Sequence, residues 1–160
     1  MKQIHLTRGK YALVDNEDFE WLSQWKWHCS HGYVVRDIRV GRGSKHRRFR
    51  QTILMHRLIL GLDVGDKRCA DHINQNRLNN QKSNLRIATY SQNEANSISR
   101  GGTSKYKGVS IYKVARKWRA RIETNGKSKH LGLYDNEKDT ACAYDKAALK
   151  YFKEFALTNF

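Results

Sequence analysis

The chain has 160 residues, of which 39% are hydrophobic, and its formal net charge is +16. This length suits one domain or two small ones. Such an excess of positive charge favours a polyanionic partner, most simply nucleic acid. A membrane surface is the rival partner, but the sequence has neither a long apolar run nor a basic amphipathic helix to support it.

The first ten residues, MKQIHLTRGK, lack the apolar segment of a signal peptide. We therefore expect a protein that is not secreted and that works in a cytoplasm, of the phage or prokaryotic host type. Cys29, Cys69 and Cys142 lie far apart and form no CxxC motif, which argues against a disulfide framework or a zinc site. We expect reduced thiols.

Residues 1–55 are predicted to form a small β-rich part. The pattern favours a strand over 10–14, a helix over 17–23 capped by Asp15 or Asn16, and strands on both sides of a turn at His31-Gly32. The tryptophans of the first of these two strands are predicted to pack in the core, with base stacking as the alternative.

A run of basic residues follows, with Gly41 and Gly43 predicting a hairpin tip. One interpretation is a solvated charged loop. The overall charge and the motif described below favour contact with DNA phosphates instead. The seven candidates are Arg36, Arg39, Arg42, Lys45, Arg47, Arg48 and Arg50.

Residues 55–60 are predicted to be helical and to end at Gly61. His56 in this helix is interpreted as a structural group, with metal ligation as the alternative. Between Asn74 and Asn96 there are seven asparagines. Asparagine favours turns and is costly to bury without partners, so we expect a compact loop with many hydrogen bonds.

Asp71 and His72 stand just before this loop. Neighbours on a strand point to opposite faces, but a strand that ends here and turns can bring both side chains to one site. Asp71 would then hold a hard divalent cation and His72 would act as a base. The asparagines are candidates for the remaining ligands.

The spacing of these residues resembles the HNH endonucleases, in the homing branch that has Asn as its final letter. The matching residues are Asp71, His72, Asn84, Leu85, Arg86, Thr89, Asn93 and Asn96, with Met55-His56-Arg57-Leu58-Ile59 upstream. The N-terminal pattern of GKYALVD, a Trp-rich strand and GY is similar to this branch too.

The resemblance implies a ββα-metal core, with one strand ending at Asp71-His72, a second near 84–88 and then a short helix. Thr89 and Gln92 fit a capping box for that helix. On this resemblance, Asp71 and Asn93 bind one divalent ion, Mg²⁺ or Mn²⁺, and His72 is the general base. Asn84 would orient the His72 ring.

Residues 97–105 are small, polar and glycine-rich, and are predicted to be a linker that becomes ordered on DNA. Beyond them, strands are predicted over 106–112, 117–123 and 127–133, with an Asn125-Gly126 hairpin turn. A helix is predicted over 137–152, with an apolar stripe for packing on this sheet.

This second unit resembles the AP2 DNA-binding domain over nearly all of its length. The matching residues include Tyr106-Lys-Gly-Val109, Lys117-Trp118-Arg-Ala120, Leu131-Gly132, Ala143-Tyr144-Asp145 and Ala156-Leu-Thr-Asn-Phe160. The resemblance implies that the outer face of the sheet lies in the major groove. The positions implied to read DNA are Ser110, Tyr112, Arg119, Arg121, Glu123, Ser128 and His130.

The sequence thus predicts an α+β protein with a nuclease module at 1–96, divided into 1–55 and 56–96, and an AP2-like domain at 106–160. The predicted function is a site-specific, metal-dependent DNA endonuclease of homing type. The expected partner is double-stranded DNA, with no membrane and no obligate protein partner. The alternatives are a regulator with an inactive HNH centre and a basic RNA-binding protein.

Overall fold

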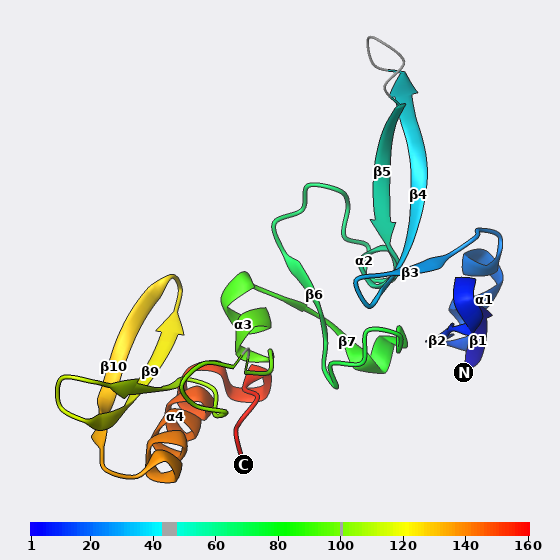
Figure 1. Cartoon of the computed structure of the whole chain (residues 1–160). Helices are drawn as coiled ribbons and strands as arrows, with labels where there is room; N and C mark the ends of the chain where they lie inside the picture. The colour runs from blue at the N-terminus through cyan, green and yellow to red at the C-terminus, as the bar shows by residue number, and fades with distance from the viewer. Residues whose placement is uncertain (43–47, 100) are drawn as a thin grey trace. The chain divides into compact units, whose positions relative to one another are not determined.

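The structure is a computed structural model that describes residues 1–42, 48–99 and 101–160; of Arg42, Arg48 and Phe49 it describes only the backbone. The chain divides into two compact units, Met1–Ala88 and Thr89–Phe160. Each is an α+β arrangement of small antiparallel sheets and helices (Figure 1). The α+β class predicted from the sequence is confirmed.

The first unit begins with a hairpin and a helix that supply part of its core. Strands β1 (Lys2–His5) and β2 (Tyr11–Val14) pair antiparallel, and α1 (Asn16–Ser23) follows as predicted. Strand β1 was not predicted, because its residues do not alternate clearly. The core residues are Ile4, Leu6, Ala12, Val14, Leu22, Trp27, Val34 and Met55.

Trp27 is buried and donates its indole N–H to the carbonyl of Leu22, which confirms a core position. Only β3 (His28–Ser30) of the predicted Trp-rich strand is extended and paired. The His31-Gly32 turn is confirmed, with φ of 49° and 83°, the left-handed values that a two-residue hairpin turn requires.

Strands β4 (Tyr33–Arg42) and β5 (Arg48–Leu54) form a long hairpin that extends the β3 sheet (Figure 1). Its tip lies outside the described residues, as do Lys45 and Arg47. The hairpin leads into α2 (Met55–Ile59), after which Gly61 has the predicted left-handed conformation with φ of 65°.

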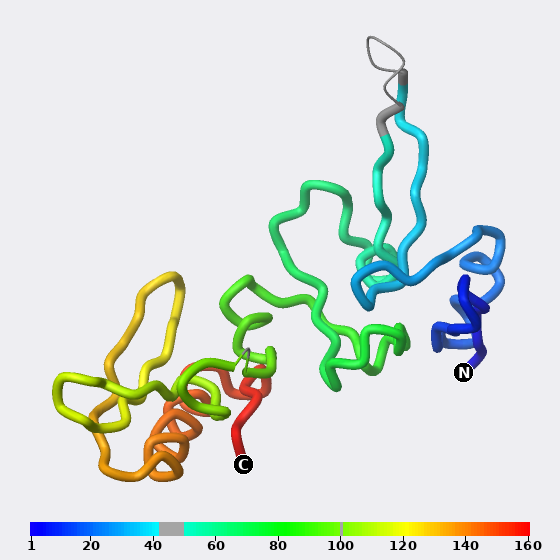
Figure 2. Tube along the Cα trace, viewed as in Figure 1, coloured from blue at the N-terminus to red at the C-terminus, as the bar shows by residue number. Residues whose placement is uncertain are grey.

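Two short strands carry the HNH-like motif. Strand β6 (Cys69–His72) pairs antiparallel with β7 (Leu85–Ala88), which a short 3₁₀ helix, η3 (Lys82–Asn84), precedes. Between them the chain folds back as a compact loop (Figure 2). The backbone of Leu13 bonds to Leu78 and Asn80, so β2 of the core holds this loop in place.

The second unit begins with α3 (Tyr90–Ala95), which was predicted as the last element of the nuclease module. Its capping box is confirmed: Thr89 Oγ1 accepts from the N–H of Gln92, and the Gln92 side chain accepts from the N–H of Thr89. By packing, therefore, the last element of the HNH-like motif belongs to the unit that carries the AP2-like sequence.

The predicted sheet and helix make up the rest of this unit. Strands β8 (Val109–Tyr112), β9 (Lys117–Thr124) and β10 (Lys127–Tyr134) form an antiparallel sheet on which α4 (Glu137–Phe152) packs. A last 3₁₀ turn, η4, spans Lys153–Phe155. Ala120 and Ile122 of β9 are buried, as their alternation predicts, and so are Tyr144 and Ala148 of α4.

The described part of the predicted linker makes hydrogen bonds within the second unit. Thr103 Oγ1 accepts from the N–H of Ile111, and the Ser104 side chain is buried. In the parts of the chain that the structure describes, no helix combines the length and the apolar character needed to cross a bilayer.

Candidate active site

Asp71 lies at the end of β6 and faces Arg86, its register partner on β7. Arg86 Nε donates to Asp71 Oδ2 at 2.8 Å, and the side chains are only 15% and 6% exposed. A charge-assisted bond between two desolvated groups is stronger than its surface counterpart. Arg86 thus fixes the orientation of a carboxylate at the end of the strand.

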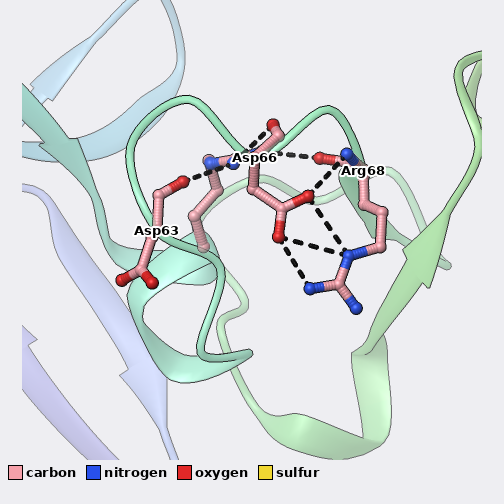
Figure 3. Close-up of polar contacts among 4 residues, drawn as sticks. Asp63, Asp66 and Arg68 are labelled. Carbon is pink, nitrogen blue, oxygen red and sulfur yellow. Dashed lines mark hydrogen bonds and ion pairs between the residues drawn. The ribbon is translucent and has the colours of Figure 1, made fainter.

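The segment that leads into β6 is held by Arg57 of α2. Its guanidinium donates to the carbonyls of Asp63, Asp66 and Arg68 at 2.8–3.1 Å. Asp66 in turn pairs with Arg68, which lowers the pKa of Asp66 to about 2 (Figure 3). The start of β6 is thereby tied to α2.

His72 is buried and its Nε2 lies 3.3 Å from Asn80 Oδ1. The Asn80 amide nitrogen donates to the carbonyl of Arg77 at 3.4 Å, so its oxygen is the atom that faces the imidazole. A carbonyl oxygen accepts only, hence Nε2 carries the proton and Nδ1 holds a lone pair. Burial lowers the pKa of His72, which favours this neutral form.

The asparagines after His72 form the predicted network of hydrogen bonds. The side-chain oxygens of Asn74, Asn76 and Asn79 each accept from the backbone N–H two residues further on. Asn80 is completely buried. These local bonds replace a hydrophobic core and give the loop a defined shape around His72.

The Asn84 side chain makes its hydrogen bonds within this loop and not to the His72 ring. Its side-chain oxygen accepts from the N–H of Asn74 at 3.0 Å, and its nitrogen donates to the carbonyl of Asn79 at 2.8 Å. His72 Nε2 instead donates to the Asn80 amide oxygen. Sequence reasoning assigned the orienting role to Asn84 because its spacing matched, and it missed Asn80.

His56 lies against His72, with ring centroids 4.8 Å apart. Tyr33 stacks on His56 at 5.2 Å and lies 6.2 Å from His72, and the Arg77 guanidinium lies 4.3 Å from the Tyr33 ring centroid. Burial, and next the neighbouring His72, lower the pKa of His56 to about 3. A neutral imidazole therefore packs beside His72, which agrees with the structural interpretation of His56.

Asn93, the predicted second metal ligand, lies on α3 in the second unit, whereas Asp71 lies in the first. Among residues 1–42, 48–99 and 101–160, no three His, Cys, Asp or Glu side chains are grouped as a metal site. The proposed pair supplies one carboxylate and one amide oxygen. Oxygen donors suit Mg²⁺ or Mn²⁺, which commonly keep waters and phosphate oxygens as further ligands.

The basic residues of 36–50 differ in their surroundings. Arg39 and Arg50 are exposed and are register partners across the β4–β5 hairpin. Arg36 instead packs its guanidinium on Trp25, 3.8 Å from the ring centroid. Burial lowers the pKa of Arg36, and its Nε is buried without a hydrogen-bond partner among the described residues.

The predicted reading positions of the second unit lie along one sheet. Arg121, Glu123, Ser128 and His130 are exposed, and Arg121 and His130 are register partners. Arg119 is partly buried, 3.4 Å from Ser110 Oγ and 5.4 Å from the Tyr112 ring. The sheet thus presents mixed polar side chains opposite the face that covers α4.

No family model matches the chain. The chain is 30% identical over 154 residues to an uncharacterized HNH endonuclease of Acanthamoeba polyphaga mimivirus, in an alignment that covers 95% of this chain and 76% of the relative. Over 61 residues, or 37% of the chain, it is 44% identical to APETALA2-like protein 2 of Oryza sativa. The same share is 41% identical to an ethylene-responsive transcription factor of Arabidopsis thaliana. These alignments cover 14% of each plant protein.

The chain belongs to the HNH endonuclease family. It combines this family's sequence with an AP2-like segment. Both resemblances seen in the residues are thereby confirmed.

Proposed function

We propose that this chain is a site-specific DNA endonuclease of homing type that depends on one divalent metal ion. The observation that carries the proposal is the buried His72, whose contact with the Asn80 oxygen selects the tautomer with an unprotonated Nδ1, directly after the Arg86-bound Asp71. Together with the family membership, this pair supports a ββα-metal centre.

His72 Nδ1 is the proposed general base. It removes a proton from a water molecule, whose oxygen attacks the phosphorus, and the bond from phosphorus to the 3′ oxygen breaks. A neutral imidazole is required for this step, and burial in the first unit favours the neutral form. Asn80 keeps the ring in the tautomer that presents Nδ1.

Asp71 and Asn93 are the proposed metal ligands. A divalent ion bound there would neutralise charge on the scissile phosphate and the departing 3′ oxygen. The role of Arg86 is to orient Asp71 through its 2.8 Å bond. Because one such centre cuts one strand per visit, nicking is the simplest outcome.

The DNA-contacting surfaces divide into two kinds. Exposed arginines of the β4–β5 hairpin, such as Arg39 and Arg50, suit phosphate contacts that do not depend on sequence. The exposed polar side chains of β9 and β10, such as Arg121, can reach base edges. The mixture of both signs on this sheet favours base reading over simple charge attraction.

The test is to incubate the full chain with a library of duplex DNA, with Mg²⁺ or EDTA, and to sequence the ends of both strands. We expect cuts at a limited set of sites, only with the metal, and a strong reduction of these cuts with His72→Ala. Selective binding without cleavage would instead identify an inactive regulator. Tighter binding to RNA than to duplex DNA would identify an RNA-binding protein.

A further inference from the structure

Lys107 closes the carboxyl end of α3. Its ammonium donates three hydrogen bonds, to the carbonyls of Glu94, Ala95 and Ser97, at 2.9, 2.5 and 2.7 Å. The last carbonyls of a helix have no partner within the helix, and a cation there also opposes the helix dipole. All these residues belong to the second unit.

The backbone of Lys107 is fixed in turn by the rest of this unit. The Asn159 side chain bonds both the N–H and the carbonyl of Lys107, and the Asp145 carboxylate of α4 accepts from Asn159. Next in the chain, the Gly108 carbonyl accepts from the N–H of Arg121 at 2.8 Å. A methyl group added at Gly108, whose φ is 75°, would overlap the Tyr144 ring.

Two other bonds hold α3. The N–H of Leu157 donates to the Ala95 carbonyl at 3.1 Å, and the N–H of Asn125, in the β9–β10 turn, donates to Ser91 Oγ at 3.2 Å. A helix of six residues is marginal in isolation. Its conformation therefore depends on these contacts with the rest of the second unit.

Residues of α3 and of the sheet line a common cavity of about 750 Å³. Its lining combines residues of α3 with the predicted base-reading side chains. They include Tyr90, Ser91 and Glu94 from the helix and Ser110, Arg119 and Arg121 from the sheet. A ligand that contacts the outer part of the sheet here also passes beside α3, the helix that carries Asn93.

We infer that Lys107 is a positioning residue that fixes α3, and with it Asn93, to the base-reading sheet, so that the enzyme cuts at a constant distance from the bases that it reads. This inference rests on the proposed function, in which Asn93 is a metal ligand. In this proposal Lys107 acts through α3, because its ammonium donates to backbone carbonyls at the end of that helix. Its role is to hold α3 in a fixed position relative to the β8–β10 sheet.

The experiment uses the full chain and compares Lys107→Met with Lys105→Met. Both variants lose one ammonium and keep an unbranched side chain, but the Lys105 ammonium is exposed and lies 5.2 Å from the Tyr106 ring. Lys107→Arg is the second variant, in case Lys107→Met does not fold. A planar guanidinium keeps the charge but cannot direct donors as the ammonium does.

The first readout is amide hydrogen exchange of residues 89–97, without metal or DNA. We expect exchange at least about tenfold faster in Lys107→Met, and no change in Lys105→Met, because local opening tracks the loss of local contacts. Unchanged exchange in the Lys107 variants would overturn the inference at its first step.

The second readout maps the cut on duplexes with base pairs inserted between the recognised bases and the original cut. Wild type and Lys105→Met should cut at a constant distance from the recognised bases. Lys107→Met should spread the cut over neighbouring phosphodiesters and need several-fold more Mg²⁺. Faster exchange with an unchanged cut and metal requirement would overturn the positioning role.

Failure of the proposed function gives a different pattern. Wild-type protein would then show no metal-dependent cleavage at all, while the exchange comparison would still test whether Lys107 holds α3. In that case slow exchange of α3 in wild type and fast exchange in Lys107→Met would support the inference that Lys107 fixes α3. Equal exchange in the two proteins would overturn it.

Discussion

Arg86 Nε lies 2.8 Å from Asp71 Oδ2, and the two residues face each other in the register of β6 and β7. Removing one partner of a desolvated pair leaves the other without its compensating charge. We expect Arg86→Met to lower the free energy of unfolding by about 1.5–3 kcal/mol, as measured by urea denaturation.

The matched control is Arg68→Met, which removes an arginine from the exposed pair with Asp66, where Arg68 is 58% exposed. A surface pair contributes only about 0–1 kcal/mol. Equal losses of stability in the two variants would contradict the importance of burial at Asp71 and Arg86.

The proposed metal ligands predict a graded change in the metal titration of cleavage. Asp71→Ala should raise the Mg²⁺ concentration for half-maximal activity most, because it removes a charged ligand. Asn93→Ala should raise it less, since the amide is neutral. Asn93→His should retain activity, because imidazole also binds divalent metals. Titrations like that of wild type for both alanine variants would exclude these residues as ligands.

The general-base assignment predicts a selective loss of rate. His72→Ala should reduce cleavage by about 10²–10⁴-fold and leave the affinity for DNA nearly unchanged. Asn80→Ser should also lower kcat, by less, because the ring loses its 3.3 Å partner but keeps its place in the fold. A matched loss of affinity and rate in His72→Ala would argue for a binding role instead.

His56 predicts a dependence of stability on pH. Its pKa is about 3 in the folded chain and about 6.5 when unfolded, so between these values the unfolded chain binds the extra proton. The neutral His56 therefore contributes fully to the free energy of unfolding above about pH 6.5. As the pH falls towards 3 this contribution is lost, and the free energy of unfolding decreases by at most about 1.4 kcal/mol per pH unit. Chemical denaturation at several pH values measures it. In His56→Gln this part of the slope should vanish, and a slope equal to that of wild type would contradict the assignment.

The two DNA-contacting surfaces should differ in salt dependence. Arg39→Ala with Arg50→Ala should weaken binding to cognate and random DNA alike and reduce the salt slope by about 2, because two phosphate contacts are lost. Arg121→Ala should weaken binding mainly to the cognate site, by about 1–3 kcal/mol if Arg121 contacts a guanine. Binding titrations on both DNAs at several salt concentrations separate the two. An equal loss on random DNA in Arg121→Ala would remove Arg121 from base reading.

Local sequence determined the elements whose signals are short-range. The capping box of Thr89 and Gln92 and the turns at His31-Gly32 and Asn125-Gly126 all appear as predicted. Each depends on the conformational preferences of two to four neighbouring residues, which are readable without the fold. The same holds for the asparagine loop, whose bonds run mostly between near neighbours.

Tertiary structure decided which of several similar side chains meet. Asn80 rather than Asn84 bonds to His72. The backbone of Leu13 in β2 bonds to Leu78 and Asn80, and this holds the Asn80 amide beside the imidazole. Arg36, one of seven basic candidates, packs on Trp25 instead of remaining exposed. Lys107 closes a helix ten or more residues away. Such pairings depend on burial and on the register of distant strands, which no local pattern contains.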